Sequence, residues 1–412
     1  MRARTRRRGL RVEVDLSTLV LIPAIAAVAP LATRAVGRWV AIPLVVFEIL
    51  LGLLLGPAVL GWVQDDAFIA LFADFGLAML FYLAGREIDF PAIRGAPIAR
   101  AGIGWAVSIA LGLGFGFLID PGAGAVFVGV ALASTALGAL LPILRDAGLL
   151  RTPFGVSVLA VGAVGEFAPL LAITLFLSGQ TPLHATLVLL AFAVVAGVLM
   201  FLASRGDGVR LHRAIEASLH TSGQFVVRLV MFVLLSLVAL SIFLGIDMLL
   251  GAFAAGVLAK LLLRGAPERE AEVTEAKIEA VGFGLLVPVF FIHTGITFDL
   301  GALVSDARTL LLLPLCTVLL LVTRGIPAAL LAPSGSTVRE RASTGFFAAT
   351  GLPVIVAVTA LGVDARVLDS GIAAALVGAG LSSMLLYPLV ALTIRTGNPR
   401  RPRQESNLRP RD

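Results

Sequence analysis

Long apolar stretches separated by short polar breaks run along nearly the whole chain. Each stretch is close to the roughly 20 residues that an α-helix needs to cross a bilayer, so the pattern predicts about 13 transmembrane helices. The connections are short, which predicts an all-α polytopic membrane protein without a soluble domain. The predicted spans are residues 16–36, 39–60, 66–85, 98–118, 123–143, 153–177, 183–203, 221–243, 246–263, 278–297, 308–331, 342–361 and 368–394.

Composition supports this class and excludes others. Of the 412 residues, 58% are hydrophobic and only 14% are charged, whereas a soluble domain carries about 25% charged residues. A single cysteine, Cys316, excludes a disulfide framework, and the four histidines lack metal-ligand spacing. We therefore expect no metal and no cofactor. The basic residues sit in short loops, so the net charge of +6 does not indicate nucleic acid as a partner.

Alternate loops carry most of the basic residues, which predicts the orientation in the membrane. By the positive-inside rule these loops and the C-terminus face the cytoplasm, and an odd number of helices then places the N-terminus outside. The arginine-rich tail at residues 1–15 disagrees with this placement, and we follow the alternation over many loops. The polar tail at residues 396–412 is rich in Pro and Arg, and we expect it to be disordered in the cytoplasm.

Two helices carry small polar residues or Gly and Pro at mid-depth. Ser134 and Thr135 interrupt the span 123–143, and the segment from Thr350 to Pro353 interrupts the span 342–361. The two spans lie seven apart in order, so they run in opposite directions. Matching interruptions in two inverted halves indicate broken helices around a site at the middle of the membrane. Alternatively, each is a small-residue packing face.

Glu166 is the main candidate for transport chemistry. It lies about thirteen residues into a helix that starts near Pro153, which places it near the centre of the bilayer at a rise of ~1.5 Å per residue. A carboxylate at that depth is costly and indicates a functional site. It can be neutralised by a proton or by a monovalent cation, and this competition is the minimum chemistry of exchange. The alternative is a structural salt bridge with Arg324.

Several other residues are candidates for the same site. The hydroxyls of Ser134 and Thr135 and the carbonyls freed near Thr350 are oxygen ligands, which hard cations prefer. Arg324 lies deep in an apolar span and needs a partner or a wet cavity.

Weaker signals come from other helices. Glu48 lies about two turns inside its helix, where it forms an ion pair or faces the core, with a role in transport as the alternative. His293 is either a titrating sensor or a hydrogen-bonded packing residue. Asp74 lies in the outer half of an apolar helix, where water reaches it. Enzymes embedded in membranes are not indicated, because the chain has no His-Glu-x-x-His, Gly-x-Ser-x-Gly or Walker motif.

Several motifs resemble the monovalent cation:proton antiporter-2 family of sodium/hydrogen exchangers. They occur in the family's order and cover about residues 16–395. The stretches that carry the resemblance are PLVVFEILLGLLLGPAVLG, FADFGLAMLFYLAGREIDF, ALASTALGALLPILRDAGLL, FGVSVLAVGAVGEFAPLLAITLF, GAFAAGVLAKL, LVPVFFIHTGITFDL and GFFAATGLPVIVAV.

The resemblance implies a homodimer in the plasma membrane, the inner membrane of a bacterial cell. A core domain at about residues 98–177 and 308–394, with two crossed broken helices, would move against a dimerisation scaffold at about residues 16–85 and 221–297. The expected activity is exchange of H⁺ for Na⁺ or K⁺ by alternating access. By the same resemblance Glu166 falls on the ion-binding carboxylate, Thr135 on the broken-helix threonine and Arg324 near the basic residue of the site.

The chain departs from the family at one position of this site. The family often has two adjacent acidic residues or Asn-Asp, whereas here Gly165 precedes Glu166. With one carboxylate we expect electroneutral exchange, and the sequence does not decide between Na⁺ and K⁺. Two alternatives stay open: a carrier of another small solute with the same fold, and a non-transporting sensor or channel-like subunit.

Overall fold

The computed structural model describes residues 16–36, 43–88, 90–177, 181–205, 224–263 and 268–396. Within these ranges every regular element is helical. Eleven helices are long and apolar enough to cross a membrane, and two shorter apolar helices, Leu44–Leu55 and Met248–Leu262, coincide with the remaining predicted spans. The prediction of an all-α polytopic protein is confirmed, with 13 as an approximate count. The N-terminal tail and residues 397–412 lie outside the described residues.

The chain forms two compact units, each built from separate parts of the sequence. Unit 1 comprises Met1–Arg86, Val198–Ala239 and Gly251–Gly301, and unit 2 comprises Glu87–Gly197, Leu240–Leu250 and Ala302–Asp412. Among the helices that pass from one unit to the other along the chain are α9 (Pro182–Arg205), α11 (Phe225–Leu244) and α12 (Met248–Leu262).

Glycines bring helix backbones into direct contact within unit 1. Its other helices are α1 (Leu16–Val36), α2 (Leu44–Leu55), α3 (Ala67–Glu87), α13 (Glu268–Val281), the π-helix η2 (Gly282–Leu286) and α14 (Val287–Ile296). A β-carbon at Gly52 of α2 would lie 2.1 Å from the carbonyl oxygen of Ile292 in α14, and one at Gly295 would lie 2.0 Å from that of Ile49. Lipid offers no hydrophobic drive between helices, so such close backbone packing stabilises the pair.

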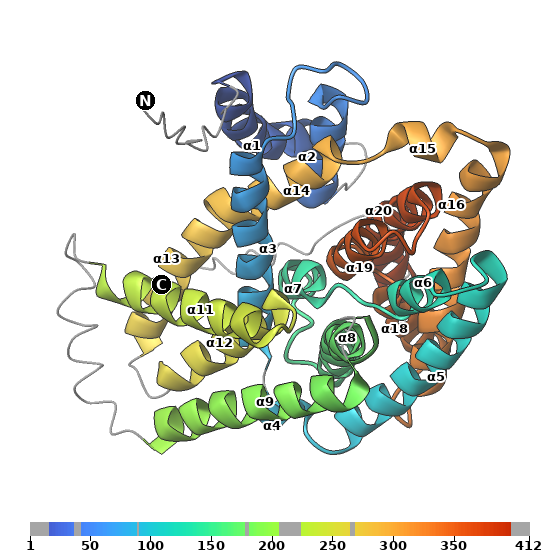
Figure 1. The fold of residues 1–412 in the computed structure, drawn as a ribbon. Coiled ribbons are helices and arrows are strands. Elements are labelled where there is room, and N and C mark those ends of the chain that lie inside the picture. The colour runs from blue at the N-terminus through green and yellow to red at the C-terminus, as the bar shows by residue number, and fades with distance from the viewer. Residues whose placement is uncertain are drawn as a thin grey trace, which may run out of the picture. The chain divides into compact units, whose positions relative to one another are not determined.

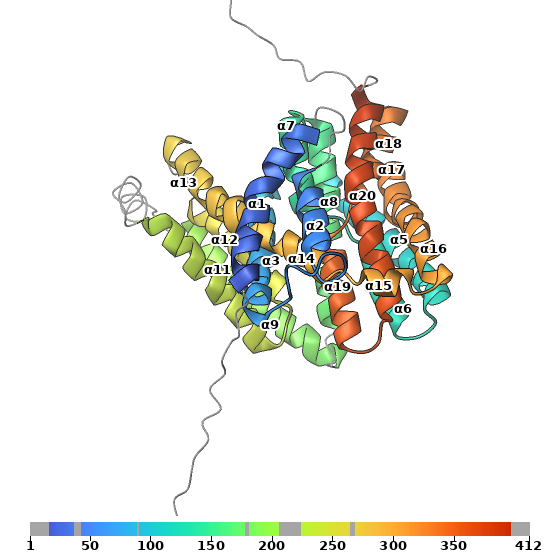
Figure 2. The same ribbon diagram turned by 90° about the horizontal axis from the view of Figure 1, so that it is seen from above.

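Unit 2 contains two three-helix sets that share one order: a long helix, a broken helix and a second long helix (Figure 1). Corresponding helices lie seven predicted membrane spans apart along the chain. Because seven is an odd number, the two sets have opposite orientations and form the inverted repeats that the sequence predicts. Figure 2 shows the long helix α20 beside α16 and α18. The first set is α5 (Ala96–Ile119), α6 (Gly124–Leu132) with α7 (Leu137–Asp146), and α8 (Pro153–Ala172) with the π-helix η1 (Ile173–Leu177). The second is α16 (Ala307–Leu320) with the π-helix η3 (Leu321–Gly325) and α17 (Ile326–Leu330), α18 (Val338–Ala348) with α19 (Pro353–Asp364), and α20 (Ser370–Thr396).

Local chemistry explains why two helices of unit 2 are broken. In the first, residues 133–136 leave the helix at Ser134 and Thr135, whose hydroxyls compete for backbone partners. In the second, residues 349–352 are unwound and Pro353 opens α19 at a position where its missing N–H costs nothing.

Several helix ends differ from the predicted boundaries. The span predicted to begin at residue 278 begins at Glu268 instead, because the charged stretch before it is rich in the strong helix formers Glu and Ala. The span predicted at 39–60 has its helix end at Leu55, where Gly56 and Pro57 follow. Two short helices, α4 (Phe90–Ile93) and α15 (Leu300–Val304), are absent from the prediction because one turn leaves no periodic signal.

Candidate functional site

The two helix breaks of unit 2 lie against each other and satisfy each other's backbone groups. The N–H of Ala136 donates to the carbonyl of Thr350 at 2.8 Å, and the hydroxyl of Thr135 donates to the carbonyl of Ala348 at 2.6 Å. Irregular backbone at membrane depth needs such partners, because lipid provides none. We call this arrangement, residues 133–136 and 349–352, the crossing.

Helix α8 is tied to the crossing at Gly165. The N–H of Thr135 donates to the carbonyl of Gly165 at 2.8 Å. A β-carbon at Gly165 would lie 2.5 Å from Thr135 Oγ1 and 2.4 Å from Arg324 Nη2. Any other residue would force these side chains to move, so glycine at this position allows α8 to approach the crossing.

Glu166 follows Gly165 on α8 and is completely buried, with 0% exposure. Among the described residues neither carboxylate oxygen has a hydrogen-bond partner. The backbone N–H groups of Leu137 and Gly138, in the first turn of α7, lie toward the carboxylate and attract its negative charge, but their geometry falls short of a hydrogen bond. This positive helix end favours a negative charge. A buried carboxylate without a full partner is expected to bind a proton or a cation.

Arg324 is also completely buried and approaches the crossing from η3. Its Nε donates to Thr135 Oγ1 at 2.8 Å and its Nη2 donates to the carbonyl of Val161 at 2.6 Å. None of the ion pairs found in the described part of the chain joins it to Glu166. Arg324, Thr135 and Ala348 thus form a chain of hydrogen bonds that ends on the last turn of α18. A positive charge there offsets the negative end of that helix dipole.

The other hydroxyls predicted for the site bind within their own helices. Ser134 donates to the carbonyl of Ala131 at 2.7 Å, and Thr350 donates to that of Phe346 at 3.1 Å. Thr350 contributes to the crossing through its carbonyl, which accepts from Ala136.

Two residues at the crossing have no place in the sequence predictions. The hydroxyl of Thr323 lies 2.9 Å from the carbonyl of Leu132 and 2.7 Å from that of Leu319, so it caps the end of α6. The hydroxyl of Ser383 lies 3.2 Å from the backbone nitrogen of Gly351. A hydroxyl in an apolar helix is a weak signal, because it usually bonds to the carbonyl four residues earlier.

Glu48 and His293, the weaker candidates, belong to unit 1, whereas the crossing belongs to unit 2. Glu48 is buried on α2, at 2% exposure. His293, on α14, has its Nε2 2.9 Å from Oδ1 of Asp65 in the connection between α2 and α3.

Inverted repeats with two crossed broken helices and a buried carboxylate define a secondary transporter. A match to the family described as sodium/hydrogen exchanger, transmembrane, covers residues 24–392, so the chain belongs to that family. The predictions of this family and of a transporter rather than an enzyme are confirmed.

Relatives and a solved structure agree with this assignment. A protein of Enterococcus hirae named Na(+)/H(+) antiporter is 24% identical over 373 residues, with 86% of this chain and 92% of the relative covered. A Bacillus subtilis (strain 168) relative is 27% identical over 374 residues, with 84% of this chain covered, and the chain spans 58% of its length. The sodium proton antiporter MjNhaP1 from Methanocaldococcus jannaschii, solved at pH 8, superposes with a TM-score of 0.63 at 15% identity, covering 92% of this chain and 96% of that one. This similarity shows that the fold is shared.

Proposed function

We propose that the chain exchanges protons for a monovalent cation, Na⁺ or K⁺, with Glu166 as the group that both ions share. One observation carries the proposal: Glu166 is 0% exposed beside the crossing, and neither of its oxygens has a hydrogen-bond partner among the described residues. A carboxylate in that setting is unfavourable when ionised and alone. A proton or a cation neutralises it, and each excludes the other.

The charges at the crossing support one-for-one exchange. Glu166, on α8 beside the crossing, is the acidic residue that the described part of the chain brings to this site, and Arg324 does not release its proton in a protein. The site therefore has the same net charge with a bound proton as with a bound monovalent cation. The crossing also offers backbone carbonyl oxygens, those of Thr135 and Thr350 among them, and oxygen is the ligand that a hard cation prefers.

The proposal also assigns a role to each of the two units and an orientation to the protein in the membrane. Unit 2 carries the crossing and acts as the moving core, and unit 1 acts as the scaffold of a homodimer. The protein resides in the plasma membrane, with its basic loops and C-terminus in the cytoplasm and its N-terminus outside. Support for the orientation comes from the alternation of basic loops, and support for the dimer comes from membership of the family.

Exchange in proteoliposomes tests the proposal. An acid-loaded vesicle with a pH-sensitive dye receives Na⁺, K⁺ or Li⁺, and choline serves as a cation too large for the site. We expect dye recovery with at least one alkali cation, and none with choline or in vesicles without protein. No recovery with any alkali cation over a range of pH would overturn the proposal and favour a carrier of another solute or a non-transporting subunit.

A further inference from the structure

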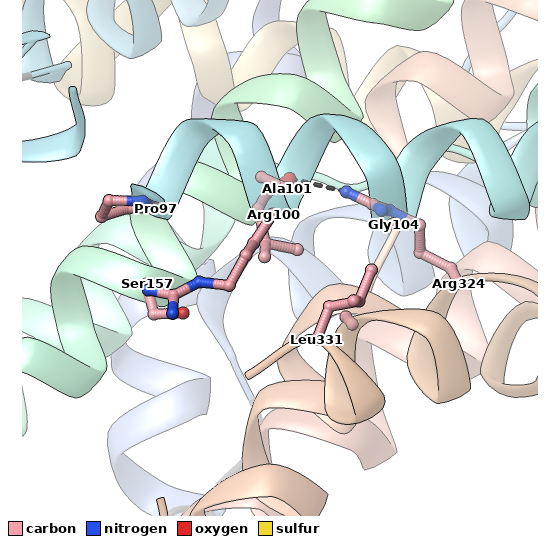
Figure 3. A pocket seen from close by; sticks show the side chains of 9 residues that line it. Pro97, Arg100, Ala101, Gly104, Ser157, Arg324 and Leu331 are labelled. Atoms are coloured by element: carbon pink, nitrogen blue, oxygen red, sulfur yellow. Dashed lines mark hydrogen bonds between the residues drawn. The ribbon is translucent and has the colours of Figure 1, made fainter. Parts of the chain in front are cut away.

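A small pocket in unit 2 lies next to Arg324, between α5, α8 and α17 (Figure 3). Its polar side chains are Arg100 of α5, Ser157 of α8 and Arg324 of η3. The other lining residues are apolar or glycine, for example Gly104 and Leu331. Figure 3 shows the side chain of Arg100 reaching from α5 toward Ser157, with Arg324 on the other side.

The charge of the lining is entirely positive. Among the described residues, Arg100 and Arg324 are its only charged residues, and none of those that line the pocket is acidic. None of the ion pairs found in the described part of the chain involves either arginine. Two arginines facing one pocket repel each other and exclude a cation.

Each arginine also has a buried nitrogen without a hydrogen-bond partner among the described residues. For Arg324, which is 0% exposed, this atom is Nη1, and for Arg100 it is Nε. A buried donor left unsatisfied costs about 1–3 kcal/mol, and more when it is charged. The pocket therefore lacks an acceptor that carries negative charge.

The size of the pocket limits what that acceptor is. Its enclosed part has room for about one water-sized particle, and the rest opens toward the surface. A phosphate or a lipid headgroup is too large for the enclosed part. A water fits but leaves the charge in place, and its protons find few acceptors because the carbonyl of Val161 already accepts from Arg324.

We propose that this pocket binds one halide-sized anion, chloride in the cell, between Arg324 and Arg100. The anion accepts from the free N–H groups and neutralises the part of the positive charge that the end of α18 does not offset. That charge is the same whether Glu166 holds a proton or a cation, which is the only step that rests on the proposed function. Anion binding is therefore expected to persist in Glu166→Gln even where transport is lost.

Thermal unfolding of the purified full chain in detergent tests the site. Choline gluconate is replaced stepwise by choline chloride or choline bromide at constant choline concentration, so that neither cation nor ionic strength changes. We expect a rise of the melting temperature by a few degrees that saturates with chloride and with bromide, because a ligand that binds only the folded state stabilises it. A change that does not saturate, or no change, would overturn the proposal.

Two variants separate the pocket from surface effects. Arg100→Gln removes a pocket donor, and we expect the half-saturating chloride concentration to rise at least tenfold. Arg94→Gln is the matched control, because Arg94 is exposed just before α5 and does not line the pocket. It should keep the wild-type response. Equal responses in the two variants would show that chloride acts elsewhere.

Bromide also allows the anion to be located directly in the wild-type protein, so this test does not require any variant to fold. Crystals of the wild-type chain grown in bromide are expected to give an anomalous diffraction peak between Arg324 and Arg100. Crystals that diffract well with no peak at this place would show that the pocket holds water only and would overturn the proposal.

Discussion

Arg324 occupies the space that a side chain at position 165 would need. A β-carbon built on Gly165 would lie 2.4 Å from Arg324 Nη2, well inside van der Waals contact. The resemblance of the sequence motifs implies an acidic residue or Asn at this position in many members of the family. In this chain the position before Glu166 is glycine, and it contributes a backbone carbonyl, which accepts from the N–H of Thr135, instead of a carboxylate.

Gly165→Ala tests this relationship. The added methyl group would collide with Arg324 and Thr135, and overpacking of this kind costs about 1–3 kcal/mol. We expect a lower melting temperature and reduced exchange. Gly102→Ala on α5 is the control, because a β-carbon there meets nothing within 4 Å. A melting temperature equal to that of the control would mean that Arg324 moves aside without cost.

Glu166→Gln should abolish exchange while the protein still folds, because the amide keeps the shape of the side chain and removes its titration. Glu166→Asp should retain part of the activity with a changed apparent cation affinity, since the carboxylate is drawn back toward α8. Dye recovery in proteoliposomes gives the rates. Glu272→Gln, which changes an exposed carboxylate on α13, serves as the control. Wild-type rates in Glu166→Gln would exclude this residue as the shared carrier.

Arg324→Ala removes a completely buried side chain and leaves the carbonyl of Val161 without its donor. We expect a loss of roughly 2–5 kcal/mol of unfolding free energy, the range for large buried truncations. Arg324→Lys should recover part of this loss, because lysine keeps the positive charge. The recovery should be incomplete, because lysine lacks the guanidinium that donates to Thr135 and to Val161 at the same time. Thermal unfolding in detergent measures both, with Arg339→Ala as the exposed control. An unchanged melting temperature in Arg324→Ala would contradict the buried position.

The hydroxyl of Thr135 links Arg324 to the end of α18, so its removal is expected to loosen the crossing. Thr135→Val keeps the shape and loses the bonds to Arg324 and to the carbonyl of Ala348, at a cost of about 1–3 kcal/mol. Thr135→Ser keeps the hydroxyl and should remain close to wild type in stability and in apparent cation affinity. If valine and serine gave the same melting temperature, the hydrogen bonds would not be the reason for threonine here.

Exchange should be insensitive to the membrane potential. With Glu166 as the one carboxylate that the described residues bring to the site, one proton is expected to replace one monovalent cation, so that no net charge moves. A potential of 100 mV, worth about 2.3 kcal/mol per charge, then neither drives nor opposes transport. Rates in liposomes held at potentials of either sign by potassium and valinomycin measure this. A rate that depends on voltage would show that a second group, such as Glu48 or Asp74, carries a proton.

The sequence predicts the helices and the breaks because both depend on local chemistry. Apolar runs mark the spans, and Ser134, Thr135 and Pro353 mark the interruptions. The depth of Glu166 follows from its distance along the helix from Pro153, because the rise per residue is fixed.

The contacts of Arg324 could not be predicted in this way. Its hydrogen bonds to Thr135 and Val161 join positions 189 and 163 residues away, and they depend on the packing of three helices. Helix η3 adds to the difficulty, because a π-helical turn changes the direction of every side chain on it relative to a regular α-helix. The requirement for glycine at position 165 is hidden for the same reason, since the atoms that exclude a side chain there come from other helices.

The bonds from Thr135 to Gly165 and from Ala136 to Thr350 join main-chain atoms only. A substitution that leaves these main-chain atoms in place therefore alters the lining and the charge of the crossing without removing the two bonds that join its segments. Ion preference can drift during evolution through individual side chains, and the architecture that presents the ion need not be rebuilt each time. Proteins that share this frame can therefore come to transport different ions with little loss of folding stability.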